Sequence, residues 1–167
     1  MAIRDALLHE LQTECAKTRA LLERVPEDKL NWRPHEKSMP MGRLATHLAE
    51  LTGWGKLVLG QDEIDIGAGF TPTIQESVAE ILATHDKNVA ACKEILAETP
   101  DEEFSKTWTM KHQGKAVFSA PKFGVMRDFV LNHMVHHRGQ LTVFLRLNDV
   151  SLPMTYGPSA DEAGGLG

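Results

Sequence analysis

The chain of 167 residues has few cysteines and few aromatic residues, and both shortages limit the fold classes that it can adopt. Its two cysteines, Cys15 and Cys92, form no C-x-x-C pair, which excludes a disulfide scaffold and favours buried thiols in a reducing cytoplasm. Aromatic residues make up 6% of the chain. The apolar residues are mainly Leu, Ala, Val and Ile, a mixture that suits helices.

Long apolar runs and long basic runs are also lacking. No segment approaches the roughly 20 apolar residues of a membrane span, and the first ten residues lack the uninterrupted apolar stretch of a signal peptide. The net charge of −5 provides no overall attraction to nucleic acid or to an anionic membrane surface. We therefore expect a cytoplasmic protein that acts on a small molecule, with neither nucleic acid nor membrane as a partner.

Apolar residues recur at helical spacing in four stretches. These stretches predict helices over Ile3–Val25, over Met41–Leu59, from just after Thr71-Pro72-Thr73 to Pro100, and from Ser119-Ala120-Pro121 to Asn148. Ser38 and Pro40 suit the start of the second helix, and Glu76 stands in capping-box spacing from Thr73 at the start of the third.

The apolar stripe of each predicted helix advances by steps of three and four residues, as in antiparallel bundles with shallow crossing angles. The fold class expected is all-α, an antiparallel four-helix bundle in a single domain over residues 1–167. Residues 104–119 alternate in polarity around Gln113-Gly114, which predicts a short β-hairpin inserted before the last helix. Residues 60–69 are expected to form a polar connection, and the tail after Ser151 an irregular one.

Histidine occupies stripe positions where a bundle ordinarily has leucine. The stripe of the second helix contains His47, and that of the fourth contains His133 and His137. A buried imidazole must be hydrogen-bonded or bind something. His133 and His137 project from one helix face, about 6 Å apart at Cβ, and can chelate one cation. With His47 they predict a divalent metal site that keeps an open coordination position.

Several alternatives stay open at this level. The three histidines are also compatible with packing residues that are hydrogen-bonded inside the core. Position 134 is methionine, so the glutamate base of the H-E-x-x-H proteases is missing, and imidazole ligands suit zinc, nickel, copper or iron. The position of His85 is compatible with three roles: a fourth ligand, a group that supports the ligands or the substrate, or a core histidine. Gln140 is compatible with a residue that fixes an imidazole tautomer and with a polar residue at the edge of the bundle. Arg138 is compatible with an anion-binding residue and with an ion-paired residue.

Three segments resemble the DinB-like proteins, a family of metal-binding four-helix bundles. They are residues 132–141 (NHMVHHRGQL), residues 46–51 (THLAEL) and residues 153–162 (PMTYGPSADE). The resemblance implies a bundle that is often homodimeric and a divalent ion, usually zinc or nickel, held by His47, His133 and His137. Characterised members of the family include thiol-dependent S-transferases and isomerases.

Three functions follow as hypotheses. The first is a metal-dependent S-transferase, in which the ion holds a low-molecular-weight thiol as thiolate for attack on an electrophile. The second is a metal-dependent hydrolase, for which Glu50 is the nearest candidate carboxylate base. The third is a non-catalytic metal-binding stress-response protein whose ion fastens the helices together. No catalytic residue beyond the metal ligands is assigned.

Overall fold

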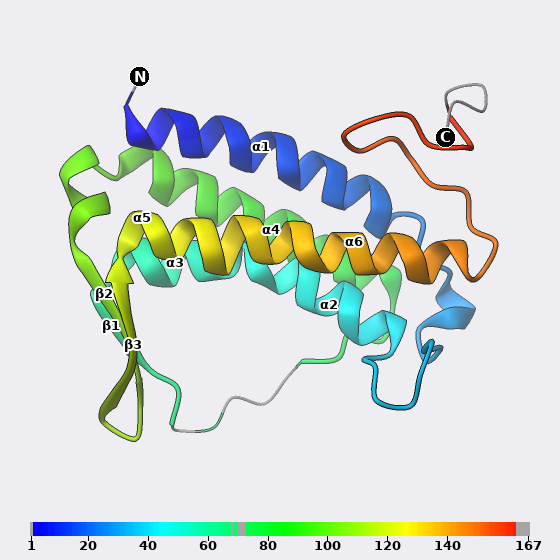
Figure 1. The fold of residues 1–167 in the computed structure, drawn as a ribbon, viewed down its shortest axis with the longest axis horizontal. Helices are drawn as coiled ribbons and strands as arrows, with labels where there is room; N and C mark the ends of the chain where they lie inside the picture. The colour runs from blue at the N-terminus through cyan, green and yellow to red at the C-terminus, as the bar shows by residue number, and fades with distance from the viewer. Residues whose placement is uncertain (1, 68, 70–72, 163–167) are drawn as a thin grey trace.

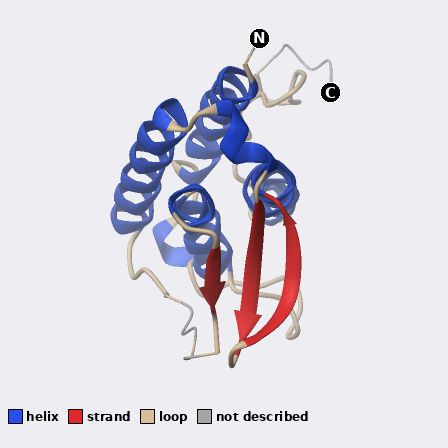
Figure 2. Ribbon diagram, turned by 90° about the vertical axis from the view of Figure 1, so that its left-hand side faces the viewer, coloured by secondary structure: helices blue, strands red, loops and turns tan. Residues whose placement is uncertain are grey.

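The computed structural model describes residues 2–67, 69 and 73–162, and it is mostly helical with a small three-stranded sheet (Figures 1 and 2). The helices are α1 (Ile3–Leu22), α2 (Met41–Leu51), α3 (Gly53–Gly60), α4 (Val78–Glu98), α5 (Lys122–Val125) and α6 (His133–Arg146). The strands are β1 (Glu63–Asp65), β2 (Thr107–His112) and β3 (Lys115–Pro121). Short 3₁₀ turns cover Glu27–Lys29 and Asp101–Ser105, and a π-helical segment covers Met126–Asn132.

The helices pack around one apolar core. In Figure 1 the helix α1, the helix α4 and the run from α5 to α6 lie along the long axis of the molecule, and α2 and α3 follow one another beneath them. Helix α4 contacts α1, α2 and α3, while α6 contacts α1 and α2. The largest buried apolar side chains are Trp108 and Phe104, which lie where the sheet meets the helices. Within the described residues, no helix combines the length and apolar character needed to cross a membrane.

The sheet confirms the predicted hairpin and adds one strand. Strands β2 and β3 pair antiparallel, and β1 pairs with β2 in parallel. The hairpin turns at Gln113 and Gly114, whose φ angles of 51° and 77° match the left-handed pair that a tight hairpin turn requires. Asp65 accepts hydrogen bonds from the backbone N–H groups of both turn residues. The mostly helical class with a hairpin is confirmed, and β1 adds a strand within the connection predicted over residues 60–69.

The second predicted helix is broken into α2 and α3 at Thr52. The backbone N–H of Gly55 bonds to the carbonyl of Thr52, so the chain winds more tightly where glycines lower the helix propensity. A Cβ at Gly55 would lie 2.3 Å from the sulfur of Cys92, so the missing side chain permits the close approach of α3 to α4. Helices α2 and α3 both pack on α4, and the predicted continuous Met41–Leu59 helix does not anticipate the break between them.

Two predicted helix starts are also corrected. The N-cap of α4 is Ser77, whose hydroxyl accepts from the backbone N–H of Glu80 at 3.2 Å, and not Thr73. The predicted spacing between Thr73 and Glu76 recurs four residues later between Ser77 and Glu80, and the Glu80 carboxylate accepts from the N–H of Glu76. Thr71 and Pro72 lie outside the described residues. Helix α2 has Pro40 at its N-cap and no capping hydrogen bond from a side chain, so Ser38 does not cap it.

The π-helical segment shifts the apolar stripe of the last helix. Met126 and Val130 are buried as predicted, but beyond the segment the buried apolar positions are Met134, Leu141 and Leu145. Because a π turn contains an extra residue, the stripe continues one position later than the sequence spacing predicts. The predicted stripe residues His133, Gln140 and Phe144 are therefore only partly buried, and Leu147 is exposed.

Candidate metal centre

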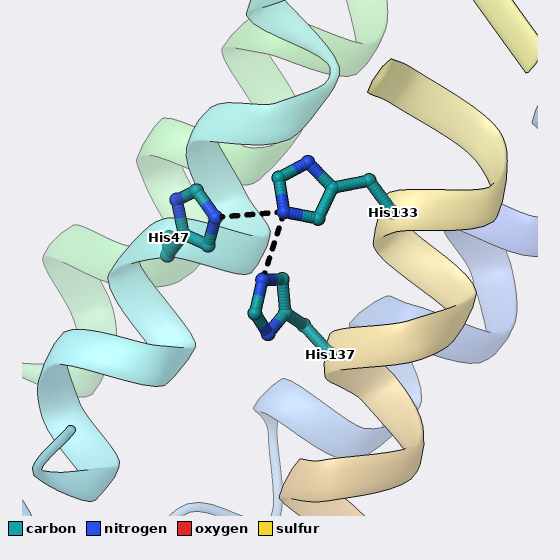
Figure 3. A group of neighbouring side chains, drawn as sticks. All are labelled: His47, His133 and His137. Atoms are coloured by element: carbon teal, nitrogen blue, oxygen red, sulfur yellow. Dashed lines mark hydrogen bonds between the residues drawn. The ribbon is translucent and has the colours of Figure 1, made fainter. Parts of the chain in front are cut away.

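Three imidazoles from two helices converge beside the core (Figure 3). The His133 Nε2 atom lies 2.9 Å from Nε2 of His137 and 3.4 Å from Nε2 of His47, and one ring nitrogen of each residue lies within 4.8 Å of the others. His137 is buried, whereas His47 and His133 are partly exposed. The group thus lies at the edge of the core and not in its centre. At this edge an exchangeable ligand can reach it. That these residues bind a metal ion stays a prediction.

A hydrogen bond on the outer side of the His137 ring supports a tautomer with a free inward nitrogen. The Nδ1 atom of His137 lies 2.7 Å from Oε1 of Gln140, and since a carbonyl oxygen only accepts, Nδ1 carries the hydrogen. For His133, the backbone carbonyl of Phe129 opposes the lowering of its pKa by burial. His47 has Nδ1 4.0 Å from the Glu50 carboxylate. Such outer acceptors are the usual supports of metal-binding histidines.

The rings are neutral at pH 7. Burial lowers the pKa of His47 to about 4, with smaller contributions from the charges of His137, His133 and Arg43. Burial also lowers the pKa of His133 and of His137. At 2.9 Å, Nε2 of His133 and Nε2 of His137 share either a hydrogen or a cation. Three neutral imidazoles that converge with one nitrogen each form a donor set that fits a divalent ion.

A cavity of about 870 Å³ opens beside the three histidines. His47 and His133 line it, so the centre faces the cavity through these two rings. Its walls come from α2, α3, α4, α6, β1, the segment after β1, β2 and the π-helical segment. Their apolar members are Trp54, Leu57, Ile64, Ile66, Met110 and Phe129. Trp54 therefore belongs to the cavity, although the sequence places it in the stripe of the second helix. The volume lies in the range of small-molecule sites, about 300–1,000 Å³.

Most polar groups of the cavity wall already have partners. Glu50 accepts from the guanidinium of Arg43 at 3.1 Å, and both side chains are mostly buried. The Asp65 carboxylate is occupied by the hairpin turn, and the amide of Asn88 donates to the backbone carbonyl of Ala49. His136 also lines the cavity, and it is exposed. The cavity thus offers mainly apolar surface next to the imidazole cluster.

Arg138 does not reach the cavity. It is buried, with 2% of its surface exposed, and its guanidinium bonds to the Glu14 carboxylate, to the Glu14 carbonyl and to Thr18. Tyr156 from the tail joins the same cluster. Of the two roles open to Arg138, the structure shows the ion pair, but inside the core and not at the surface.

The two cysteines are buried thiols, as expected. Burial raises the pKa of Cys15 and of Cys92 to about 12 each. Thiols with such values are almost fully protonated at neutral pH and make poor nucleophiles. A reaction at this centre that needs a thiolate must therefore use a thiol from solution.

His85 stands apart from the cluster. It is buried in α4, its Nδ1 bonds to the carboxylate of Asp86 at 3.1 Å, and its Nε2 has no hydrogen-bond partner among the described residues. It is absent from the set of ring nitrogens that gather around His133. The core-histidine alternative therefore describes it, with the carboxylate of Asp86 as its hydrogen-bond partner.

The burial of His85 predicts an acid-sensitive fold. Burial lowers its pKa below the usual 6.5, although Asp86 opposes the shift. The unfolded chain therefore binds more protons as the pH falls below about 6.5, and the free energy of unfolding should decrease. Urea titrations of metal-free protein at pH 7, 6 and 5 measure the slope, which should be shallower in His85→Leu than in wild type. The exposed-site variant His9→Leu should keep the wild-type slope, and equal slopes in all three proteins would contradict the assignment.

Comparisons with known proteins agree with this fold. Residues 10–141 match the model of the DinB superfamily, so the chain belongs to that superfamily. It is similar to the uncharacterized protein YrdA of Bacillus subtilis, with 22% identity over 162 residues that cover 95% of this chain and 90% of YrdA.

Two solved structures share the fold. A DinB-like protein from Bacillus cereus superposes with a TM-score of 0.72 at 20% identity, covering 91% of this chain and 97% of that one. The DinB-like protein YjoA of Bacillus subtilis gives 0.70 at 17% identity, covering 90% of this chain and 96% of its own. These similarities establish the fold, and the chemistry of the centre must be argued from its residues.

Proposed function

We propose that the chain is a metal-dependent, thiol-dependent S-transferase with a low-molecular-weight thiol as cosubstrate. His47, His133 and His137 would hold one divalent ion, zinc or nickel. The observation that carries the proposal is the convergence of one ring nitrogen each from His47, His133 and His137, within 4.8 Å of one another, beside an apolar cavity that His47 and His133 line. When bound, such an ion favours the thiolate form of a thiol at neutral pH.

The residues of the chain supply binding and exclusion of water. Trp54, Leu57 and Phe129 provide apolar surface for an electrophile next to the histidines. In the transfer, the thiol gives its proton to solvent, its sulfur bonds to an electrophilic carbon, and the leaving group departs with the electrons of the broken bond. Because Cys15 and Cys92 are buried and protonated, the reacting sulfur comes from the cosubstrate.

A hydrolase is the second candidate, and Glu50 is the observation that favours it. This carboxylate lines the cavity 4.0 Å from His47 Nδ1, within reach of a water molecule beside the centre. Its ion pair with Arg43 weighs against a role as base, since the guanidinium already occupies the carboxylate. A non-catalytic metal-binding protein is the third candidate.

The candidates are separated by one set of assays. Zinc- or nickel-loaded protein is mixed with cysteine, glutathione or coenzyme A and with 1-chloro-2,4-dinitrobenzene, and the absorbance of the thioether is followed. We expect a rate at least about tenfold above that of chelator-treated protein. No increase with any thiol contradicts the transferase, and turnover of ester or lactone substrates without thiol supports the hydrolase. A melting temperature that rises with metal, without turnover of any substrate, supports the binding protein.

The proposal includes the expected setting of the enzyme. We take residues 1–167 as one domain, its helices as an antiparallel four-helix bundle, and the protein as a cytoplasmic homodimer. Light scattering coupled to size-exclusion chromatography measures the oligomeric state, and a mass of one chain would remove the homodimer from the proposal.

A further inference from the structure

Gln140 bonds to two histidines at once. Its Oε1 lies 2.7 Å from Nδ1 of His137, and its Nε2 lies 3.1 Å from Nε2 of His136. Gln140 stands three residues after His137 and four after His136, so both rings lie within reach of one side chain on the same helix. Neither Gln140 nor His137 lines the cavity, whereas His136 does.

The amide of Gln140 is placed with its oxygen toward His137 and its nitrogen toward His136. An amide oxygen only accepts and an amide NH₂ only donates, so in this arrangement His137 donates through Nδ1 and His136 accepts at Nε2. An acceptor at Nε2 of His136 favours this orientation of the amide over the reverse one. If the amide were reversed, its NH₂ would face Nδ1, and His137 would have to move its hydrogen to Nε2. The nitrogen that points toward His133 would then no longer be free to bind a cation.

We propose that Gln140 is the positioning residue of the candidate metal centre, fixing the tautomer and the orientation of His137, with His136 as the group that orients its amide. The inference rests on the proposed function, because it assumes that His137 is a ligand. It also connects the cavity to the candidate metal centre, because His136 lines the cavity and contacts Gln140, which contacts His137. A molecule that displaces His136 from Gln140 would weaken metal binding, and by reciprocity metal would weaken the binding of that molecule.

The test compares two variants that differ in hydrogen bonding but little in size. Gln140→Met cannot accept from Nδ1, whereas Gln140→Glu can. Zinc affinity is measured by competition with a chromophoric chelator, and the geometry of the centre by the visible absorption of the cobalt-substituted protein. Gln140→Met should bind zinc about 10–100-fold more weakly than wild type, the usual loss for an outer partner of a metal ligand. Gln140→Glu should stay within about threefold of wild type and keep its cobalt spectrum.

His136→Phe tests the second contact. It removes the acceptor that orients the amide but keeps an aromatic ring on the cavity wall. We expect a loss of zinc affinity between those of Gln140→Glu and Gln140→Met. Circular dichroism of the metal-free variants controls for folding.

Two results overturn the inference. One is a Gln140→Met protein with zinc affinity within twofold of wild type, and the other is equal losses in Gln140→Met and Gln140→Glu, which would indicate packing and not hydrogen bonding. Both leave the proposed function intact if wild type binds zinc. A wild-type protein that binds neither zinc nor nickel instead overturns the proposed function itself.

Discussion

Replacing His133 by alanine is expected to abolish stoichiometric binding of zinc or nickel. His133 is the central member of the cluster, since its Nε2 is the atom that contacts both His47 and His137. Its loss leaves two rings on different helices with no nitrogen between them. Because losing a mere outer partner weakens metal binding about 10–100-fold, losing this ligand should weaken it by more than about 100-fold. Elemental analysis after dialysis against zinc gives the metal content per chain.

A matched variant separates this loss from a general effect of removing a histidine. His112 lies in β2 beside the hairpin turn, is exposed and belongs to no ring cluster among the described residues. His112→Ala should retain about one ion per chain. If His133→Ala also retained a full equivalent of zinc at wild-type affinity, the cluster would not be the binding site.

Breaking the buried ion pair of Arg138 should destabilise the fold by about 3–5 kcal/mol. Arg138→Met leaves Glu14 buried beside Lys17 and Tyr156 without its main cation. Burial raises the pKa of Glu14, but hydrogen bonds from Tyr156, Arg138 and Lys17 outweigh it and hold the pKa below its usual value. With Arg138 removed, part of that support is lost. The midpoint and slope of urea unfolding at pH 7 measure the change.

Two further variants show whether the loss comes from an uncompensated buried charge. The double variant Glu14→Leu with Arg138→Met removes both charges and should be more stable than Arg138→Met alone. Arg127→Met breaks an ion pair with Glu10 whose side chains are more than a third exposed, and should cost less than about 1 kcal/mol. A loss below 1 kcal/mol in Arg138→Met, or a double variant as unstable as the sum of both single variants, would contradict this account.

The sequence predicts the helical character, the hairpin and the three histidines that come together. These features depend on local periodicity and on a short turn motif, which a sequence displays directly. The structure places His47 close to His133 and His137 because α2 packs on α6, and a stripe of apolar residues on each helix is enough to anticipate that contact. No local sequence pattern of this kind indicates which metal the chain binds or which reaction it catalyses.

Other features depend on contacts that no local pattern shows. The close approach of Gly55 to Cys92 joins residues 37 positions apart in the chain. The partner of Arg138 is Glu14 on α1, 124 positions away, and the sequence does not show this pairing. For Gln140 the sequence leaves two alternatives open, and its contacts with His136 and His137 appear only in the structure. The stripe that contains His47 also contains Trp54, but the cavity that both residues line is formed together with β1 and β2.

The wide turn at Met126–Asn132 has a consequence for how this last helix can vary. It inserts a rotational offset of about 100° between the upstream half, which meets the sheet, and the downstream half, which presents His133 and His137. The buried face of each half can thus point in its own direction around the helix axis. A chain one residue shorter here would wind uniformly, and its imidazoles would swing out of register with His47 while the rest of the sequence stayed the same. Length, and not only residue identity, is constrained in this segment.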